Sequence, residues 1–149
     1  MFQVDLFSPS ASNVVLAEAV PLPSGVLSRN VLRRLYVAPG SNLKYPLTHL
    51  DHVELQYGLF KGRYHYSVCV NVSKACRSYA PSPKWRKHAE SFEAAEVLAI
   101  ADAVALINEL GKGKLNAGVL IGMLARGDFE ESVREGPCRS MFDEASAND

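Results

Sequence analysis

Apolar and polar residues alternate most regularly on the two sides of Lys61-Gly62. If these two residues form a hairpin turn, Phe60 faces Arg63, and the next pairs join only apolar residues: Leu59 with Tyr64, Tyr57 with Tyr66, Leu55 with Val68, and Val53 with Val70. The opposite face then carries Glu54, Gln56, Gly58, His65, Ser67, Cys69 and Asn71. Because the pattern and the turn agree on one register, the sequence predicts an antiparallel hairpin with one face on the core and the other open.

Helical spacing begins after residue 90. Ser91 is a typical N-cap, Glu93 suits the positive end of a helix, and Gly111 can end it. An apolar stripe is predicted to face the core at Ala94, Val97, Ala101, Val104 and Ile107.

A shorter helix is predicted from about Asn116 to Arg126, with Gly127 as its stop. Its core side would hold Val119, Leu120, Met123 and Leu124. Asp128 with Glu131 resembles a capping box, which indicates a last helical turn running to Glu135.

The first fifty residues have weaker patterns. Residues 2–7 alternate apolar and polar, and residues 14–20 are rich in apolar and β-branched side chains, so each segment is predicted to be a strand. Residues 25–37 fit a helix and a strand equally well. Prolines and glycines then mark a loop from residue 39 to about His52.

Together these elements predict one α+β domain, residues 1–149, with a loose tail at 136–149. Its small antiparallel sheet, of three to five strands, would have the hairpin 53–72 at its centre and pack against one long and one short C-terminal helix. A chain of 149 residues with 48% apolar and 21% charged residues is typical of one globular domain.

The composition also indicates the compartment. No stretch approaches the ~20 apolar residues that cross a bilayer, and the N-terminus lacks the basic start and apolar run of a secretory signal. Cys69, Cys76 and Cys138 are odd in number and have no Cys-x-x-Cys spacing, which is typical of reduced thiols. A cytoplasmic protein without a membrane partner is therefore expected.

The net charge of zero conceals a separation of charges. Residues 61–88 hold seven Lys and Arg residues and no acid, whereas residues 128–149 hold seven acids and two Arg residues. Cations interleaved with aromatic rings are typical of nucleic-acid surfaces, although an acidic protein would be attracted equally and a solvated loop has the same composition. The candidate binding residues are Lys74, Arg77, Tyr79, Lys84, Trp85, Arg86 and Lys87.

Motifs for catalysis are missing from the sequence. It has no Walker A, Gly-x-Gly-x-x-Gly or Gly-x-Ser-x-Gly pattern, and Gly111-Lys112-Gly113-Lys114 is better explained as a helix stop and loop. His65 and Cys69 would stand about 13 Å apart on one strand, too far for a dyad, and Glu54 opposite Cys69 would raise the pKa of its thiol.

The predicted function is that of a non-enzymatic binding or regulatory protein, of the inhibitor or adaptor type found in phages and mobile elements. It would bind an anionic partner, nucleic acid or an acidic protein surface, through residues 74–88 and without a cofactor or metal. One alternative is that the acidic residues from Asp128 to Asp149 mimic nucleic acid and block a basic nucleic-acid-binding complex. Another is a small metal-assisted hydrolase that uses His49, Asp51 and His52 with His65 and Glu54.

Overall fold

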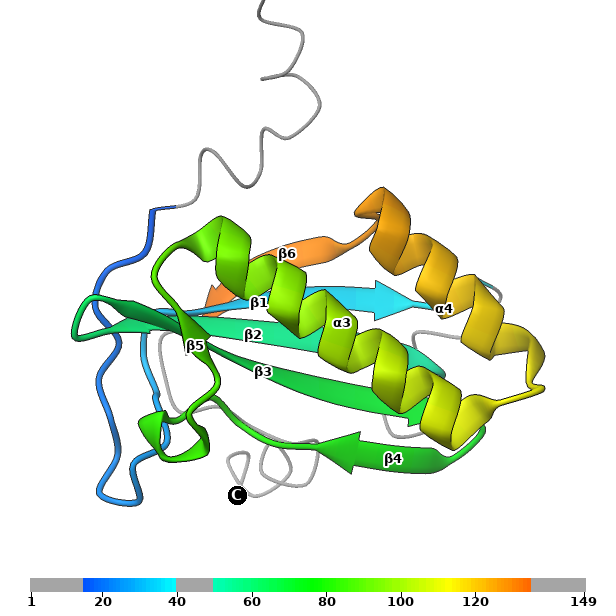
Figure 1. The fold of residues 1–149 in the computed structure, drawn as a ribbon, viewed down its shortest axis with the longest axis horizontal. Coiled ribbons are helices and arrows are strands. Elements are labelled where there is room, and N and C mark those ends of the chain that lie inside the picture. The colour runs from blue at the N-terminus through cyan, green and yellow to red at the C-terminus, as the bar shows by residue number, and fades with distance from the viewer. Residues whose placement is uncertain (1–14, 40–49, 135–149) are drawn as a thin grey trace, which may run out of the picture.

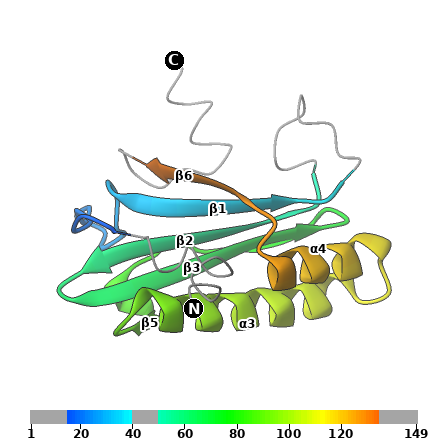
Figure 2. The same ribbon diagram turned by 90° about the horizontal axis from the view of Figure 1, so that it is seen from above.

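The computed structural model describes residues 15–39 and 50–134, which form a six-stranded antiparallel sheet with two helices on one face (Figures 1 and 2). In chain order the elements are β1 (Val31–Val37), β2 (His52–Phe60), β3 (Arg63–Val72), β4 (Ala75–Ser78), the 3-10 helix η2 (Pro83–Trp85), β5 (His88–Ala89), α3 (Phe92–Gly111), α4 (Leu115–Arg126) and β6 (Glu130–Arg134). The predicted α+β fold is confirmed, including the central hairpin and the long and short helices, but the sheet has six strands rather than the expected three to five. Neither helix has the length and apolar character needed to cross a membrane.

The strands lie in the order β4-β3-β2-β1-β6, and β5 also pairs with β3. β2 and β3 pair in the predicted register, from Phe60 opposite Arg63 to Val53 opposite Val70. Lys61 and Gly62 have φ values of 52° and 77°, so both turn residues adopt the left-handed conformation that a tight hairpin turn requires. The turn and the apolar pairs therefore fix the same register.

The helices lie along one face of the sheet (Figure 2), and the core is formed by the side chains between the two layers. The helix-facing side chains of the hairpin are buried against α3. Tyr57 packs on Phe92 at the start of α3, with ring centroids 4.8 Å apart. Further along the helix, alanine side chains allow the backbone of α3 to lie close to the sheet, at Ala95, Ala99 and Ala103.

The predicted core stripe of α3 is wrong except at its end. Ala94, Val97 and Ala101 are exposed, whereas Val104 is half-buried against the core and Ile107 is buried as predicted. The buried face consists of Phe92, Ala95, Ala99, Ala103, Ile107 and Gly111. Because α3 is apolar on almost every side, its periodicity does not select the face that is buried, and the large side chain of Phe92 does so by packing on Tyr57.

The prediction for α4 is confirmed, with Leu120, Met123 and Leu124 buried and Gly127 ending the helix at φ 70°. The predicted helical turn after it is wrong, because residues 130–134 form β6 and pair with β1. The backbone hydrogen bonds available along the edge of β1 outweigh a local capping signal.

The N-terminal predictions have mixed outcomes. Residues 15–20 form no regular strand, and their only bridge in the described chain joins Glu18 to Leu59. The ambiguous segment 25–37 contains β1. The strand predicted at 2–7 and the tail at 136–149 lie outside the described residues, as does most of the loop predicted after residue 39.

The face of the hairpin predicted to be open is buried. Glu54 forms an ion pair with Arg33 of β1, and Leu27 packs over Gly58, where an added Cβ atom would lie 3.0 Å from Leu27 Cδ1. The other buried polar residues of this face are His52, Gln56, His65, Ser67 and Asn71. The hairpin is thus buried on both faces, one lined mainly by polar and the other mainly by apolar side chains.

Candidate functional site

Residues 79–88, here called the basic loop, have a defined conformation. Ser82 caps η2, since its hydroxyl oxygen accepts a hydrogen bond from the Lys84 amide and donates one to the Gly25 carbonyl at 2.9 Å. Arg86 then ends η2 in the left-handed conformation, with φ 57°. The buried Ser82 anchors the loop, and Lys84, Trp85 and Arg86 are presented to solvent.

Trp85 is held in place although 46% of its surface is exposed. Its indole N–H donates to the Ala80 carbonyl at 2.9 Å, and the Tyr79 ring contacts it edge to face with centroids 6.4 Å apart. The Lys84 ammonium lies 5.9 Å from the centroid of the indole ring. The loop therefore offers a fixed aromatic surface beside a cation.

Asp102 of α3 anchors the basic loop to the helix. Its Oδ2 atom accepts hydrogen bonds from the Tyr79 hydroxyl at 3.2 Å and from Lys87 Nζ at 2.7 Å. Burial, and then the Asp102 carboxylate, raise the pKa of Tyr79, so its hydroxyl stays protonated and keeps donating. Lys87 also lies 5.5 Å from the Tyr79 ring centroid.

The predicted cations fall into two groups. Lys87 is paired with Asp102, and Arg77 Nη1 is paired with Glu109 Oε1 of α3 at 2.7 Å. The other three, Lys74, Lys84 and Arg86, are exposed and form no ion pair with any residue of the described ranges. Of the predicted cations, these three are the ones whose charge is not offset by an acid in the described ranges.

The structure brings most of the predicted binding residues together, but not all of them. Tyr79, Lys84, Trp85, Arg86 and Lys87 share the basic loop. Lys74 lies in the β3–β4 turn, at the opposite end of β4 (Figure 1).

Arg63 is a neighbour of the basic loop that the sequence did not indicate. β5 pairs with β3 through His88 and His65, and this pairing brings Arg63 Nη1 within 3.5 Å of His88 Nδ1. A strand of two residues has no pattern to recognise, so the contact between loop and hairpin could not be predicted. Arg63 adds an exposed cation beside the loop.

The described members of the hydrolase alternative do not converge. Asp51 accepts hydrogen bonds from the Ser73 amide and from Asn116 Nδ2, both at 2.8 Å, which tie the β3–β4 turn to α4. His52 bonds the Leu50 carbonyl through Nδ1, and His65 lies at the other end of the hairpin. His49 lies outside the described residues, within which no three His, Cys, Asp or Glu side chains are grouped to hold a metal ion.

Cys69 is a protonated thiol at neutral pH. Burial, then the neighbouring Cys76 and Glu54, raise the pKa of Cys69 to about 12. The predicted direction is confirmed, with burial as the larger cause. His52 Nε2 lies 4.0 Å from Cys69 Sγ, but a thiol with this pKa is not an activated nucleophile.

The environment of the buried His65 side chain is expected to make the protein less stable in mild acid. Burial, and then His88, lower the pKa of His65 below the usual 6.5. The unfolded chain therefore takes up a proton at His65 more readily than the folded chain, so stability that is complete above pH 6.5 is lost as the pH falls through the folded-state pKa. The free energy of unfolding should fall between pH 7.5 and pH 5.5 by less in His65→Gln than in the unmodified chain. Equal falls in urea titrations of the two proteins would contradict this.

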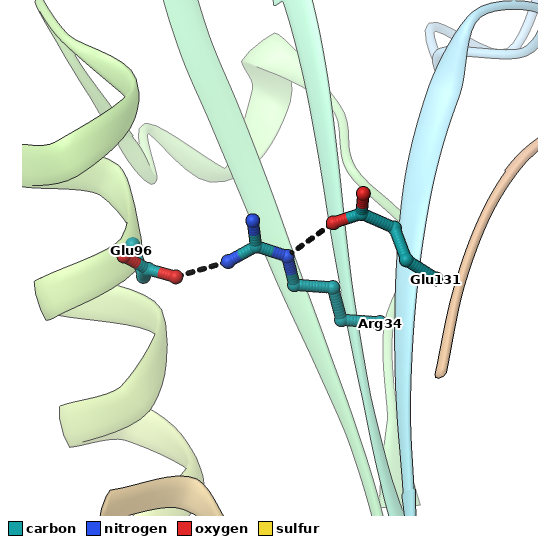
Figure 3. Close-up of polar contacts among 3 residues, drawn as sticks. All are labelled: Arg34, Glu96 and Glu131. Atoms are coloured by element: carbon teal, nitrogen blue, oxygen red, sulfur yellow. Dashed lines mark hydrogen bonds and ion pairs between the residues drawn. The ribbon is translucent and has the colours of Figure 1, made fainter. Parts of the chain in front are cut away.

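Arg34 of β1 is the most completely buried charged side chain of the described chain (Figure 3). It forms ion pairs with Glu96 of α3 and with Glu131 of β6, the latter from Nε at 2.7 Å. The aromatic rings of Phe129, Phe92 and Tyr57 surround its guanidinium group, with centroids 4.4, 4.9 and 5.9 Å from Cζ.

This network was missed because the segment 25–37 is ambiguous in sequence. The adjacent arginines Arg33 and Arg34 could have indicated it. Neighbouring residues of a strand point to opposite faces of the sheet, so one of the two must point toward the core. The network joins β1, α3 and β6. Burial also raises the pKa of the adjacent Tyr36 to about 12.

The acidic surface of the other alternative is only partly described. Glu131 is bound to Arg34, and Asp128 Oδ2 lies 3.8 Å from Arg126 Nη2. Residues 135–149 lie outside the described ranges. The described acids thus include one that has a structural role.

Comparisons with protein-family models, with curated proteins and with solved structures found no match to this chain. Its function is therefore inferred from its own geometry.

Proposed function

We propose that this protein acts by binding rather than catalysis and that the basic loop binds single-stranded nucleic acid. The observation that carries the proposal is Trp85, which is half exposed yet held by the Ala80 carbonyl and Tyr79. An aromatic side chain in a fixed orientation can stack on any base, because every base has a π face.

The charges beside Trp85 support the same partner. Lys84 and Arg86 flank it in sequence, are exposed, and form no ion pair within the described chain. Arg63 contacts His88 at the C-terminal end of the basic loop. A base stacked on Trp85 would bring its phosphates within reach of these cations, which supply affinity without sequence specificity.

The test is fluorescence anisotropy of labelled single-stranded RNA, single-stranded DNA and duplex DNA, titrated with the full chain at low and physiological salt. Single strands should bind more tightly than the duplex, and affinity should fall as salt rises. Lys84→Glu/Arg86→Glu should weaken binding by at least about tenfold, because two attractive charges become repulsive. Trp85→Ala should weaken single-strand binding by about 1–3 kcal/mol and duplex binding by less.

Lys114→Glu/Arg126→Glu is the matched control. It changes the net charge equally at exposed sites at the two ends of α4, its N-cap and its last residue, away from the basic loop (Figure 1). If the control loses as much nucleic-acid affinity as Lys84→Glu/Arg86→Glu, binding depends on net charge alone and not on the basic loop. If no nucleic acid binds at low salt, the proposal fails, and an acidic protein surface becomes the partner to test.

A further inference from the structure

The side of α3 that faces away from the sheet is apolar and uncovered. Val97 and Leu98 are 67% and 42% exposed, and Ala94, Ala101 and Ala105 are exposed around them. At 100° per residue these five side chains fall within about 60° of one direction, opposite the buried face. Figure 2 shows no described element on that side of the helix.

This outer face contains no charge between its two ends. Of the acids of α3 between those ends, Glu96 lies on the sheet side and is bound to Arg34, Asp102 lies on a flank and is bound to Lys87, and Glu109 is paired with Arg77. A surface helix of a monomer usually has charged and polar residues opposite its core face, whereas a helix that is apolar all round is buried. The composition of α3 is that of a helix covered on both sides.

Charges at the two ends of the face indicate what covers it. Glu90 and Glu93 lie at its N-terminal end, and Lys112 at its C-terminal end, all exposed. We propose that a second copy of this chain packs against the face with its own α3 antiparallel, forming a two-fold symmetric dimer. An antiparallel arrangement places each acidic end against the basic end of the other copy, and a parallel one would place like charges together.

A two-fold axis at Ala101 fixes the register. Residues whose numbers sum to 202 then lie level with each other, so Val97 lies level with Ala105 of the second copy, and Glu90 with its Lys112. The small side chains at 94, 101 and 105 permit close approach of the helices. Glu93 comes level with Glu109, whose charge is offset by Arg77.

The test is sedimentation velocity of the full chain at low ionic strength over a range of protein concentration. A face about 20 Å long gives a small interface, so a dimer in the micromolar range is expected. Val97→Asp should raise the dissociation constant by at least about tenfold. Val20→Asp, at a similarly exposed residue outside α3, should leave it unchanged.

A charge exchange identifies the second copy and its orientation. Glu90→Lys and Lys112→Glu should each weaken the homodimer several-fold, because each introduces like charges at both ends of the interface. Mixed in equal amounts, the two variants should form a heterodimer, since opposite charges then meet at both ends. A chain that stays monomeric at every concentration would overturn the proposal, as would a dimer insensitive to Val97→Asp.

Discussion

Replacing Glu96 and Glu131 together by alanine is expected to lower the free energy of unfolding by about 3 kcal/mol or more. The double substitution leaves the guanidinium of Arg34 without either ion-pair partner, although its side chain has no exposed surface. A buried charge that loses its partners keeps its full desolvation cost. Urea unfolding followed by circular dichroism measures the change.

Arg34→Met provides the control that separates charge from packing. It removes the buried charge and leaves an unbranched apolar side chain among Phe92, Phe129 and Tyr57, while Glu96 and Glu131 retain access to water. Its cost should be under about 1.5 kcal/mol, because a buried ion pair replaced by apolar groups is often nearly neutral. If Arg34→Met destabilises more than the double alanine variant, the network stabilises by packing rather than by charge.

The network also bears on the proposed site. It holds the first turns of α3 to β1, and Asp102 of the same helix holds Tyr79 and Lys87 of the basic loop. If α3 is attached less firmly, the contacts of Asp102 with Tyr79 and Lys87 should weaken, and Trp85, which packs on Tyr79, should be held less firmly. Single-strand affinity should then fall in the double alanine variant, although neither residue lies in the loop.

The hairpin could be predicted because two independent signals agree on it. The Lys61-Gly62 turn fixes one register, the apolar alternation fixes the same one, and a slip of one residue would place Val53, Leu55 and Tyr57 on the wrong face. α3 shows the opposite case. Its caps define where it begins, but alanines on every side leave its orientation to contacts that are distant in sequence.

Long-range pairings account for most of what the sequence did not predict. β6 pairs with β1, and Arg34 reaches Glu131 across 97 residues. The residues of the basic loop were identified from composition alone. The α3 acids that neutralise Lys87 and Arg77 were not, because nothing in the sequence places Asp102 and Glu109 beside residues 77–87.

Gly111→Ala is expected to lower the free energy of unfolding by about 1–3 kcal/mol, although alanine favours helices. Gly111 ends α3 where the helix meets the end of β3, and an added Cβ atom would lie 2.5 Å from Val72 Cγ1 and 3.3 Å from Ala117 Cβ. Val72 is fully buried and cannot move aside without displacing the core. The measurement is again urea unfolding.

Gly118→Ala is the matched control, because a Cβ atom there would have no neighbour within 4 Å and the residue lies inside α4. It should raise stability by up to about 1 kcal/mol. Val72→Ala should cost less in the Gly111→Ala background than alone, since the smaller side chain relieves the contact. If Gly111→Ala were as stable as the unmodified chain, the end of α3 would lie farther from β3 than described. The pairing of Arg77 with Glu109, two residues earlier in α3, would then lose its structural basis.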